Sequence, residues 1–187
     1  MSEHRRYLPS KVDCKRWTLF LDRDGVINQY LPADYAKTKD DFILNNDVVE
    51  AIGELKRIFH RVVMVTNQQG IGKEVMSNAD LENVHLKLFN SLKEKGISYF
   101  DSAFYAPYLK ADKHHWRKPS TGMMLKSQEY FPEINFNESV VVGDSPGDME
   151  LAQKMGAIRV KIRNPEFDFD NQDYTYTNLK EFVDCMS

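Results

Sequence analysis

Two aspartates one residue apart follow a short apolar segment near the start of the sequence, which reads Trp17-Thr-Leu-Phe-Leu-Asp22-Arg-Asp24-Gly. In an extended chain alternate side chains lie on the same side, so we expect Asp22 and Asp24 to leave the end of a strand together while Arg23 points away. Paired carboxylates need a counter-charge, and a hard cation such as Mg²⁺ prefers oxygen ligands. Asp22 could then act as a nucleophile, with Asp24 as acid and base.

Asp and Gly are also common in turns, so this short motif alone fits a simple turn equally well. Later segments of the sequence favour a catalytic site over a simple turn. Thr66 and Asn67 end a second apolar run and offer a hydroxyl and an amide to a phosphate, and Asp144 follows a further run. Because ligands gather at the carboxyl ends of parallel strands, we expect Asp22, Thr66 and Asp144 to meet at one edge of a sheet.

Two basic residues, Arg117 and Lys118, precede a predicted helix. Such residues often only face water, but beside an acidic edge they can anchor an anionic substrate. Lys118 is a compact charge suited to a phosphate, and Arg117 offers a fork of donors to a second anion. Asp148 opens a later helix, where it can support a metal site with Asp144 or simply favour the helix N-terminus.

Hydrophobic periodicity predicts the elements that must position these side chains. Short β-branched apolar runs predict strands at 17–21, 61–66, 100–105, 138–143 and 158–162. Helical spacing predicts helices at 47–59, 79–95, 121–130, 149–155 and 179–186. Their alternation predicts an α/β fold with a doubly wound, mainly parallel sheet, helices on both faces and no separate cap domain.

Composition narrows the class of protein. The chain has 187 residues, two cysteines and a net charge of -3, which argues against nucleic-acid binding through overall charge and against a disulfide framework. No apolar stretch is long enough to span a membrane or to act as a secretory signal, so we expect a cytoplasmic protein. Residues 1–16 are predicted to be a solvated basic arm and residues 17–187 a single domain.

Four motifs, in this order, resemble those of the haloacid dehalogenase (HAD) superfamily of phosphatases. They are Asp22-Arg-Asp24-Gly-Val-Ile-Asn, Thr66-Asn-Gln-Gln-Gly-Ile-Gly, Arg117-Lys-Pro and Gly143-Asp-Ser-Pro-Gly-Asp148. The residues in these motifs are similar to those of the branch that contains heptose bisphosphate and histidinol-phosphate phosphatases. The resemblance implies a HAD-like Rossmannoid fold and a magnesium-dependent phosphatase that acts on a small phosphate ester.

The resemblance also implies catalytic roles. Asp22 would form an aspartyl phosphate, and Asp24 would protonate the leaving oxygen and then activate water. Thr66 and Lys118 would hold the transferring phosphoryl group, helped by Asn67, while Arg117 would contact the substrate beyond it.

The implied Mg²⁺ ligands are the Asp22 side chain, the Asp24 main-chain carbonyl and Asp144, with Asp148 in a supporting role. Phosphoryl transfer needs an in-line nucleophile and positive charge around the phosphoryl oxygens, and these residues with Lys118 supply both. The acid role further requires an environment that raises the pKa of Asp24 relative to that of Asp22.

Many members of that branch carry a zinc-binding cysteine and histidine cluster in the segment that corresponds to 105–117. Here the segment holds His114, His115 and Trp116 but no cysteine, so we expect no zinc and side chains that pack or line the pocket entrance. Because this segment differs from that of the branch, the resemblance does not decide which substrate is hydrolysed. A sugar phosphate or bisphosphate resembling heptose bisphosphate is the first expectation, and histidinol phosphate is the alternative.

A phospho-aspartate signalling receiver is a candidate from a different class, because receivers also place Thr and Lys after a phosphorylated Asp. Asp24 discriminates between the two, since an acid and base two residues after the nucleophile promotes turnover. A catalytically silent binding protein ranks last. We expect no nucleic-acid or membrane partner, and the sequence leaves the oligomeric state open.

Overall fold

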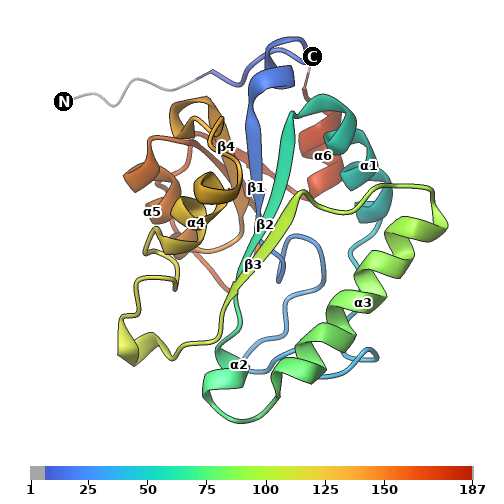
Figure 1. Ribbon diagram of the computed structural model, residues 1–187, viewed down its shortest axis with the longest axis vertical. Coiled ribbons are helices and arrows are strands. Elements are labelled where there is room, and N and C mark those ends of the chain that lie inside the picture. The colour runs from blue at the N-terminus through green and yellow to red at the C-terminus, as the bar shows by residue number, and fades with distance from the viewer. Residues whose placement is uncertain (1–6, 187) are drawn as a thin grey trace.

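The computed structural model describes residues 7–186, which form a six-stranded sheet in the order β3-β2-β1-β4-β5-β6 with every neighbouring pair parallel. The strands are β1 (Thr18–Leu21), β2 (Arg61–Asn67), β3 (Ser102–Ala106), β4 (Ser139–Gly143), β5 (Ile158–Ile162) and β6 (Tyr174–Tyr176). Figure 1 shows β1 and β2 crossing the middle of the molecule. The predicted doubly wound parallel sheet is confirmed.

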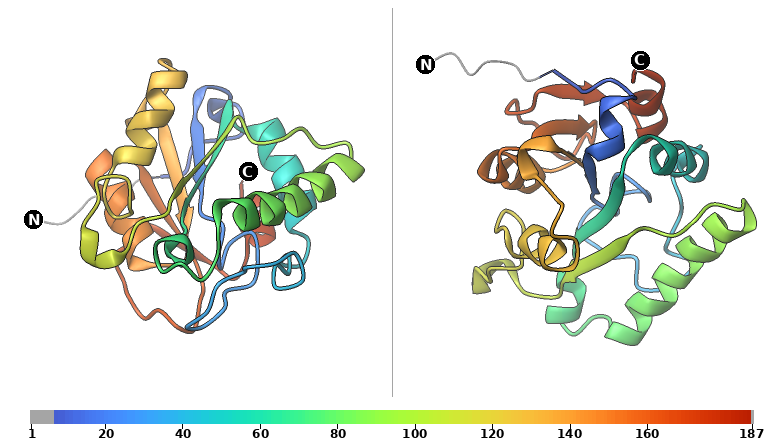
Figure 2. Two further views of the ribbon diagram at one scale, coloured as in Figure 1. Left: turned by 60° about the horizontal axis from the view of Figure 1, so that its bottom comes forward. Right: turned by 45° about the horizontal axis from the view of Figure 1, so that its top comes forward.

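Helices cover both faces of the sheet, and alternation along the strands decides which side chains meet them. Leu19 and Leu21 of β1 join the core beneath α1 (Val48–Ile58), α3 (Asn78–Glu94) and α6 (Leu179–Asp184), whereas Phe20 joins the core beneath α4 (Gly122–Tyr130) and α5 (Pro146–Met155). The two groups of helices lie on opposite sides of the sheet in Figure 2. None of the helices in residues 7–186 is both long and apolar enough to cross a membrane.

Several short elements were not predicted. They are β6, α2 (Gln69–Gly72) and three 3₁₀ helices at Asp13–Arg16, Lys110–Asp112 and Phe136–Glu138. β6 has only three residues and lies within a polar link, so it lacks the apolar run that revealed the other strands. α5 begins at Pro146 rather than 149, because Ser145 and Asp148 form a capping box and proline is favoured in a first helical turn.

The predicted solvated arm is wrong near Cys14. This side chain is fully buried in the core, and its carbonyl accepts a hydrogen bond from His60 N. The charged side chains of Lys11, Lys15 and Arg16 are exposed, as expected for an arm. The first six residues of the predicted arm lie outside the described residues.

The central strand β1 pairs with β2 on one side and with β4 on the other, so the strand order changes direction at β1. A sheet of this kind opens a crevice at the carboxyl ends of these strands. The connections 22–47, 107–121 and 144–145 start at this edge of the sheet. They carry most of the side chains whose chemistry was noted in the sequence.

Candidate active site

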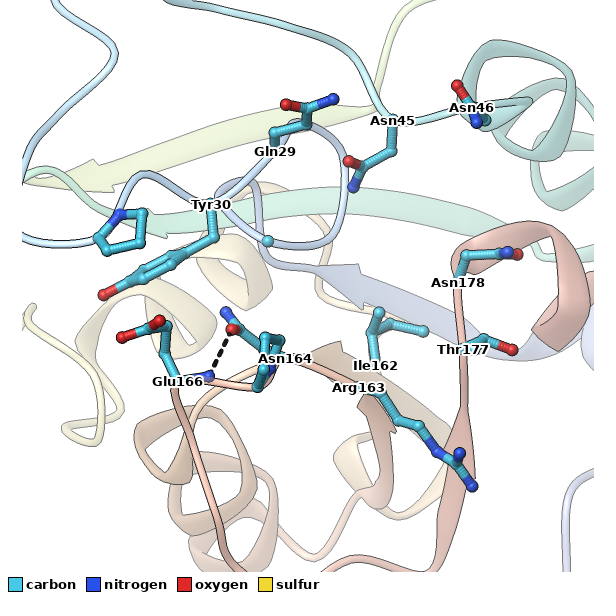
Figure 3. Close-up of a pocket in the computed structure, with 13 residues that line it drawn as sticks. Gln29, Tyr30, Asn45, Asn46, Ile162, Arg163, Asn164, Glu166, Thr177 and Asn178 are labelled. Atoms are coloured by element: carbon cyan, nitrogen blue, oxygen red, sulfur yellow. Dashed lines mark hydrogen bonds between the residues drawn. The ribbon is translucent and has the colours of Figure 1, made fainter.

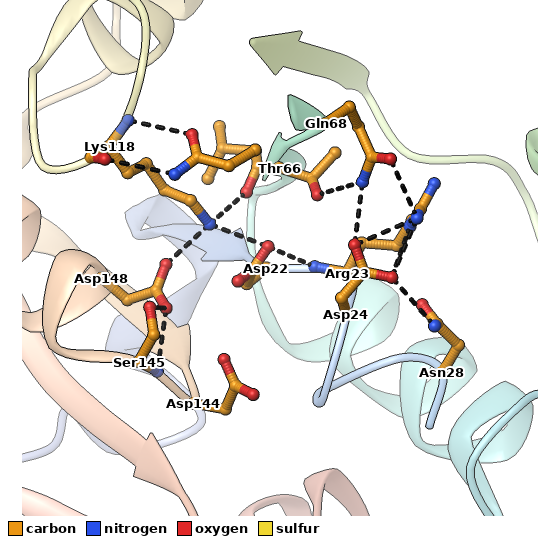
Figure 4. A network of polar contacts seen from close by, with 12 residues as sticks. Asp22, Arg23, Asp24, Asn28, Thr66, Gln68, Lys118, Asp144, Ser145 and Asp148 are labelled. Atoms are coloured by element: carbon orange, nitrogen blue, oxygen red, sulfur yellow. Dashed lines mark hydrogen bonds and ion pairs between the residues drawn. The ribbon is translucent and has the colours of Figure 1, made fainter. Parts of the chain in front are cut away.

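The structure brings together side chains from four separate segments at the carboxyl edge of the sheet. Asp22 follows β1, Thr66 lies near the end of β2, and Asp144 follows β4. Lys118 comes from the connection between β3 and α4, and Asp148 from the first turn of α5. Figure 4 shows these side chains converging.

Lys118 lies at the centre of this group and is buried. Its Nζ is 2.8 Å from Asp22 Oδ1 and 2.7 Å from Asp148 Oδ1, and it donates a hydrogen bond to Val65 O at 2.9 Å. Burial by itself lowers the pKa of Lys118, but the charges of Asp148 and Asp22 outweigh it and raise this pKa far above its usual value. The ammonium is therefore charged.

Asp22, Asp144 and Asp148 form a buried acidic cluster whose ligand atoms all lie within 4.8 Å of one another. Burial raises the pKa of Asp22 and of Asp144, and the neighbouring carboxylates raise both further. One ammonium cannot balance three ionised carboxylates, and a bound cation would supply the missing positive charge. The oxygen-only ligand set of the cluster fits a hard divalent ion such as Mg²⁺.

Two glycines make room for this cluster. A Cβ on Gly143 would lie 2.2 Å from Asp148 Cβ, and a Cβ on Gly25 would lie 1.8 Å from Asp144 Oδ2. Gly25 also has a φ of +81°, a conformation that other residues rarely adopt. Glycine at both positions thus lets the backbone lie closer to Asp148 and Asp144 than a residue with a Cβ would allow.

Arg23 does not point away from the carboxylates as predicted. Its side chain is only 1% exposed, and Nη2 donates to both oxygens of Asp24, at 2.8 and 3.0 Å. Asn28 Nδ2 and Gln68 Nε2 also donate to Asp24. Arg23 Nη1 lies 3.3 Å from His85 Nε2, and burial followed by the charge of Arg23 lowers the pKa of His85 to about 4. Alternation along a strand predicts only the direction of the Cα–Cβ bond, and a side chain as long as arginine can fold back toward its neighbours.

The pKa order of the two aspartates is the reverse of the one that the acid role requires. Burial acts to raise the pKa of Asp24, but the charge and hydrogen bonds of Arg23 outweigh it and lower this pKa below its usual value. Asp22, in contrast, has a raised pKa because it is buried beside Asp148. Asp24 is therefore ionised in the structure, held by Arg23.

Gln68 is a site residue that the sequence analysis missed. Its Nε2 donates to Thr66 Oγ1 at 3.0 Å and to Asp24 Oδ2 at 2.8 Å, and its Oε1 accepts from Arg23. It thus joins the predicted phosphate-binding hydroxyl to the predicted acid and base (Figure 4). Its position two residues after Thr66 was a usable signal, since alternate residues share a side.

Asn67 holds the segment that carries Lys118. Its Nδ2 donates to Lys118 O at 3.2 Å and its Oδ1 accepts from Lys118 N at 3.0 Å. Both polar atoms of the amide are thus engaged with backbone. The direct contact with phosphate predicted for Asn67 stays a prediction, and positioning Lys118 is what its geometry supports.

A cavity of about 1030 Å³ opens above the acidic cluster and is lined by Asp22, Asp24, Lys118 and Asp144. Five further cations line it, namely Arg23, which is paired with Asp24, and Lys73, Lys110, Lys113 and Arg117. Two anions, Asp34 and Glu150, also line the cavity, and Asp34 is paired with Lys37 at 2.9 Å. The cavity is thus rich in positive charge away from the acidic cluster.

The histidines of the 105–117 segment pack against aromatic neighbours. His114 stacks on Tyr108 with ring centroids 3.4 Å apart, and its Nδ1 accepts from Trp116 N. Trp116 packs edge-on against Phe104. This agrees with the expected packing, while the absence of zinc stays a prediction.

Comparisons with known proteins identify the family of the chain and its fold. A model of the polynucleotide kinase 3 phosphatase family matches residues 19–182. The chain is 35% identical over 142 residues to the D-glycero-alpha-D-manno-heptose-1,7-bisphosphate 7-phosphatase of Mycobacterium bovis, covering 76% of this chain and 74% of that one. It is 31% identical over 147 residues to the histidine biosynthesis bifunctional protein HisB of Campylobacter jejuni subsp. doylei, covering 76% of this chain and 40% of that protein.

A solved structure is also similar. It is D,D-heptose 1,7-bisphosphate phosphatase from B. bronchiseptica complexed with magnesium and phosphate, with a TM-score of 0.81 and 26% identity. The similarity covers 90% of this chain and 96% of that one. The resemblance noted in the sequence therefore extends to the whole sheet and its helices.

Proposed function

The chain belongs to the polynucleotide kinase 3 phosphatase family, within the HAD phosphatases, and is a phosphomonoester hydrolase; we propose that it hydrolyses a small sugar bisphosphate with the help of Mg²⁺. The observation that carries the proposal is the ion pair between Asp22 and Lys118 on the floor of a large cationic cavity. It places a carboxylate nucleophile beside the positive charge that a phosphoryl group needs.

In the proposed reaction an Asp22 carboxylate oxygen attacks phosphorus, and the bond from phosphorus to the leaving oxygen breaks. Lys118 and Thr66 hold the phosphoryl oxygens. Water then attacks the aspartyl phosphate, which releases phosphate and restores Asp22. Asp22, the Asp24 carbonyl and Asp144 would bind Mg²⁺, with Asp148 nearby, and the ion would neutralise charge on the phosphoryl group.

Asp24 gives a proton to the leaving oxygen and later takes one from water. The Arg23 contacts hold Asp24 as a carboxylate, so its protonation requires a change of surroundings. A phosphate dianion bound beside Asp24 supplies one, because a nearby negative charge raises the pKa of a carboxyl group. We infer that Asp24 leaves Arg23 when substrate binds.

The cationic lining of the cavity favours a substrate with a second anionic group. Arg117, Lys110 and Lys113 can contact a second phosphate, whereas histidinol carries cationic groups that they would repel. The HisB relative keeps histidinol phosphate as the second candidate. Charge complementarity ranks it below a sugar bisphosphate.

The proposal is tested with a panel of phosphate esters that includes heptose and hexose bisphosphates, their monophosphates and histidinol phosphate. We expect turnover with Mg²⁺, the largest kcat/KM for a bisphosphate, and loss of activity in excess chelator. Phosphate release is the measurement. A stably phosphorylated protein that does not turn over would support the receiver reading, and a preference for histidinol phosphate would contradict the substrate proposal.

Arg117→Met is expected to raise KM for a sugar bisphosphate about tenfold, since hydrogen bonds to charged groups contribute about 1.5 kcal/mol or more. The same substitution should change KM much less for the matching monophosphate that lacks the second group. Lys126→Met is the control, because Lys126 lies on α4 and does not line the cavity. Equal effects on both substrates would contradict a second-phosphate contact.

A further inference from the structure

Asn164 lies next to the acidic cluster although no motif pointed to it. It follows β5 by two residues and is only 8% exposed. Its Nδ2 donates a hydrogen bond of 2.6 Å to Asp144 Oδ2. Polar residues just past the strand ends were the signal that located Asp22 and Asp144, and Asn164 fits the same signal.

The orientation of the Asn164 amide is fixed by the backbone that follows it. Glu166 N donates to Asn164 Oδ1 at 3.0 Å, the contact drawn in Figure 3. The oxygen of the amide is therefore the acceptor in this turn, and the amide nitrogen is the atom that faces Asp144. A flipped amide would lose both hydrogen bonds.

The same oxygen of Asp144 is confined on another side by Gly25, where an added Cβ would lie 1.8 Å from it. Asp144 Oδ2 is thus held between a backbone that lacks a side chain and a buried amide donor. This leaves Asp144 Oδ1 as the oxygen that a cation in the cluster can take.

We propose that Asn164 is a positioning residue that holds Asp144 Oδ2, so that Oδ1 is directed toward a divalent cation shared with Asp22. The inference rests on the proposed function, because it concerns the same metal-dependent site. Groups that hydrogen-bond a metal ligand fix its orientation, and removing one typically weakens metal binding or activity by about 10- to 100-fold.

Asn164→Ser and Asn164→Ala separate this role from a purely structural one. A serine hydroxyl can accept the Glu166 N–H and preserve the turn, but it is too short to reach Asp144. Alanine loses both contacts. Asn46→Ala is the matched control, because Asn46 lines the same pocket of about 390 Å³ as Asn164 (Figure 3).

The primary measurement is Mn²⁺ binding by the full chain without substrate, and electron paramagnetic resonance detects the bound ion. Melting temperatures in chelator check that each variant is folded, and the Mg²⁺ dependence of phosphate release is a second readout. We expect both Asn164 variants to bind Mn²⁺ about tenfold more weakly or worse, with kcat at saturating Mg²⁺ within a few-fold of wild type. Asn46→Ala should match wild type.

Wild-type Mn²⁺ affinity in Asn164→Ser would overturn the inference, because that variant lacks only the donor to Asp144. If Asn164→Ala fails to fold, the serine variant decides alone. Failure of the proposed function looks different: the wild-type chain would bind Mn²⁺, and lose affinity in both Asn164 variants, yet hydrolyse no ester in the panel.

Discussion

We expect Asp22→Asn to lower kcat for phosphate release by about 10⁴-fold or more, because the amide cannot attack phosphorus. Asp22 is the carboxylate paired with Lys118 at 2.8 Å, and it lies beside Asp144 within the acidic cluster. Asparagine has nearly the same shape, so the substitution removes the nucleophile while leaving the cavity intact. Initial rates of phosphate release at saturating Mg²⁺ measure the effect.

The fold should survive this substitution. Asp22 is buried beside Asp148 and Asp144, and its raised pKa records how unfavourable another negative charge is there. Asparagine removes that charge, and Lys118 keeps Asp148 as its partner. We expect a melting temperature in chelator no lower than that of wild type. An active Asp22→Asn enzyme, or one that is inactive because it unfolds, would contradict this account.

Lys118→Met should have the largest effect on stability among the site substitutions. It leaves Asp22 and Asp148 buried without their shared cation, and breaking a buried ion pair from one side costs about 3–5 kcal/mol. For a chain of this size that corresponds to a melting temperature about 10 °C lower. Activity should also fall by about 100-fold or more, because the phosphoryl group loses a buried positive charge.

Thermal unfolding in chelator measures the loss, with Lys154→Met as the control. Lys154 also donates to the Lys118 segment, at Pro119 O, but its contact is exposed. Adding Asp22→Asn to Lys118→Met should recover part of the lost stability, since it removes one of the two uncompensated charges. A double variant whose change in stability equals the sum of the two single changes would show that the two side chains are not energetically coupled.

The sheet could be predicted from the sequence because its strands are short apolar runs that are buried on both faces. β4 and β5 were recognised in this way, and parallel strands necessarily bring their carboxyl ends together. The meeting of Asp22, Thr66 and Asp144 at one edge followed from that rule alone. Cys14 was missed because a single buried side chain in a polar segment has no periodicity.

The contacts around the two catalytic candidates could not be predicted, because they depend on side-chain torsions and on neighbours distant in sequence. Arg23 meets Gln68 and His85 only after β2 and α3 have packed. Asn164 reaches Asp144 across two adjacent strands, β4 and β5. The pKa order of Asp22 and Asp24 follows from these contacts, so it too was beyond the sequence.

The three partners of Lys118 have a consequence for how tightly the enzyme holds its product. Lys118 Nζ forms ion pairs with Asp22 and Asp148 and donates a hydrogen bond to the carbonyl of Val65, so the buried ammonium is already surrounded by protein oxygens. An incoming phosphate therefore competes with these two carboxylates for Lys118, and the free energy it gains is the difference between two strong contacts. Free phosphate departs by the reverse exchange, in which the protein's own carboxylates displace the product, so the resting arrangement of the site itself favours release after each turnover.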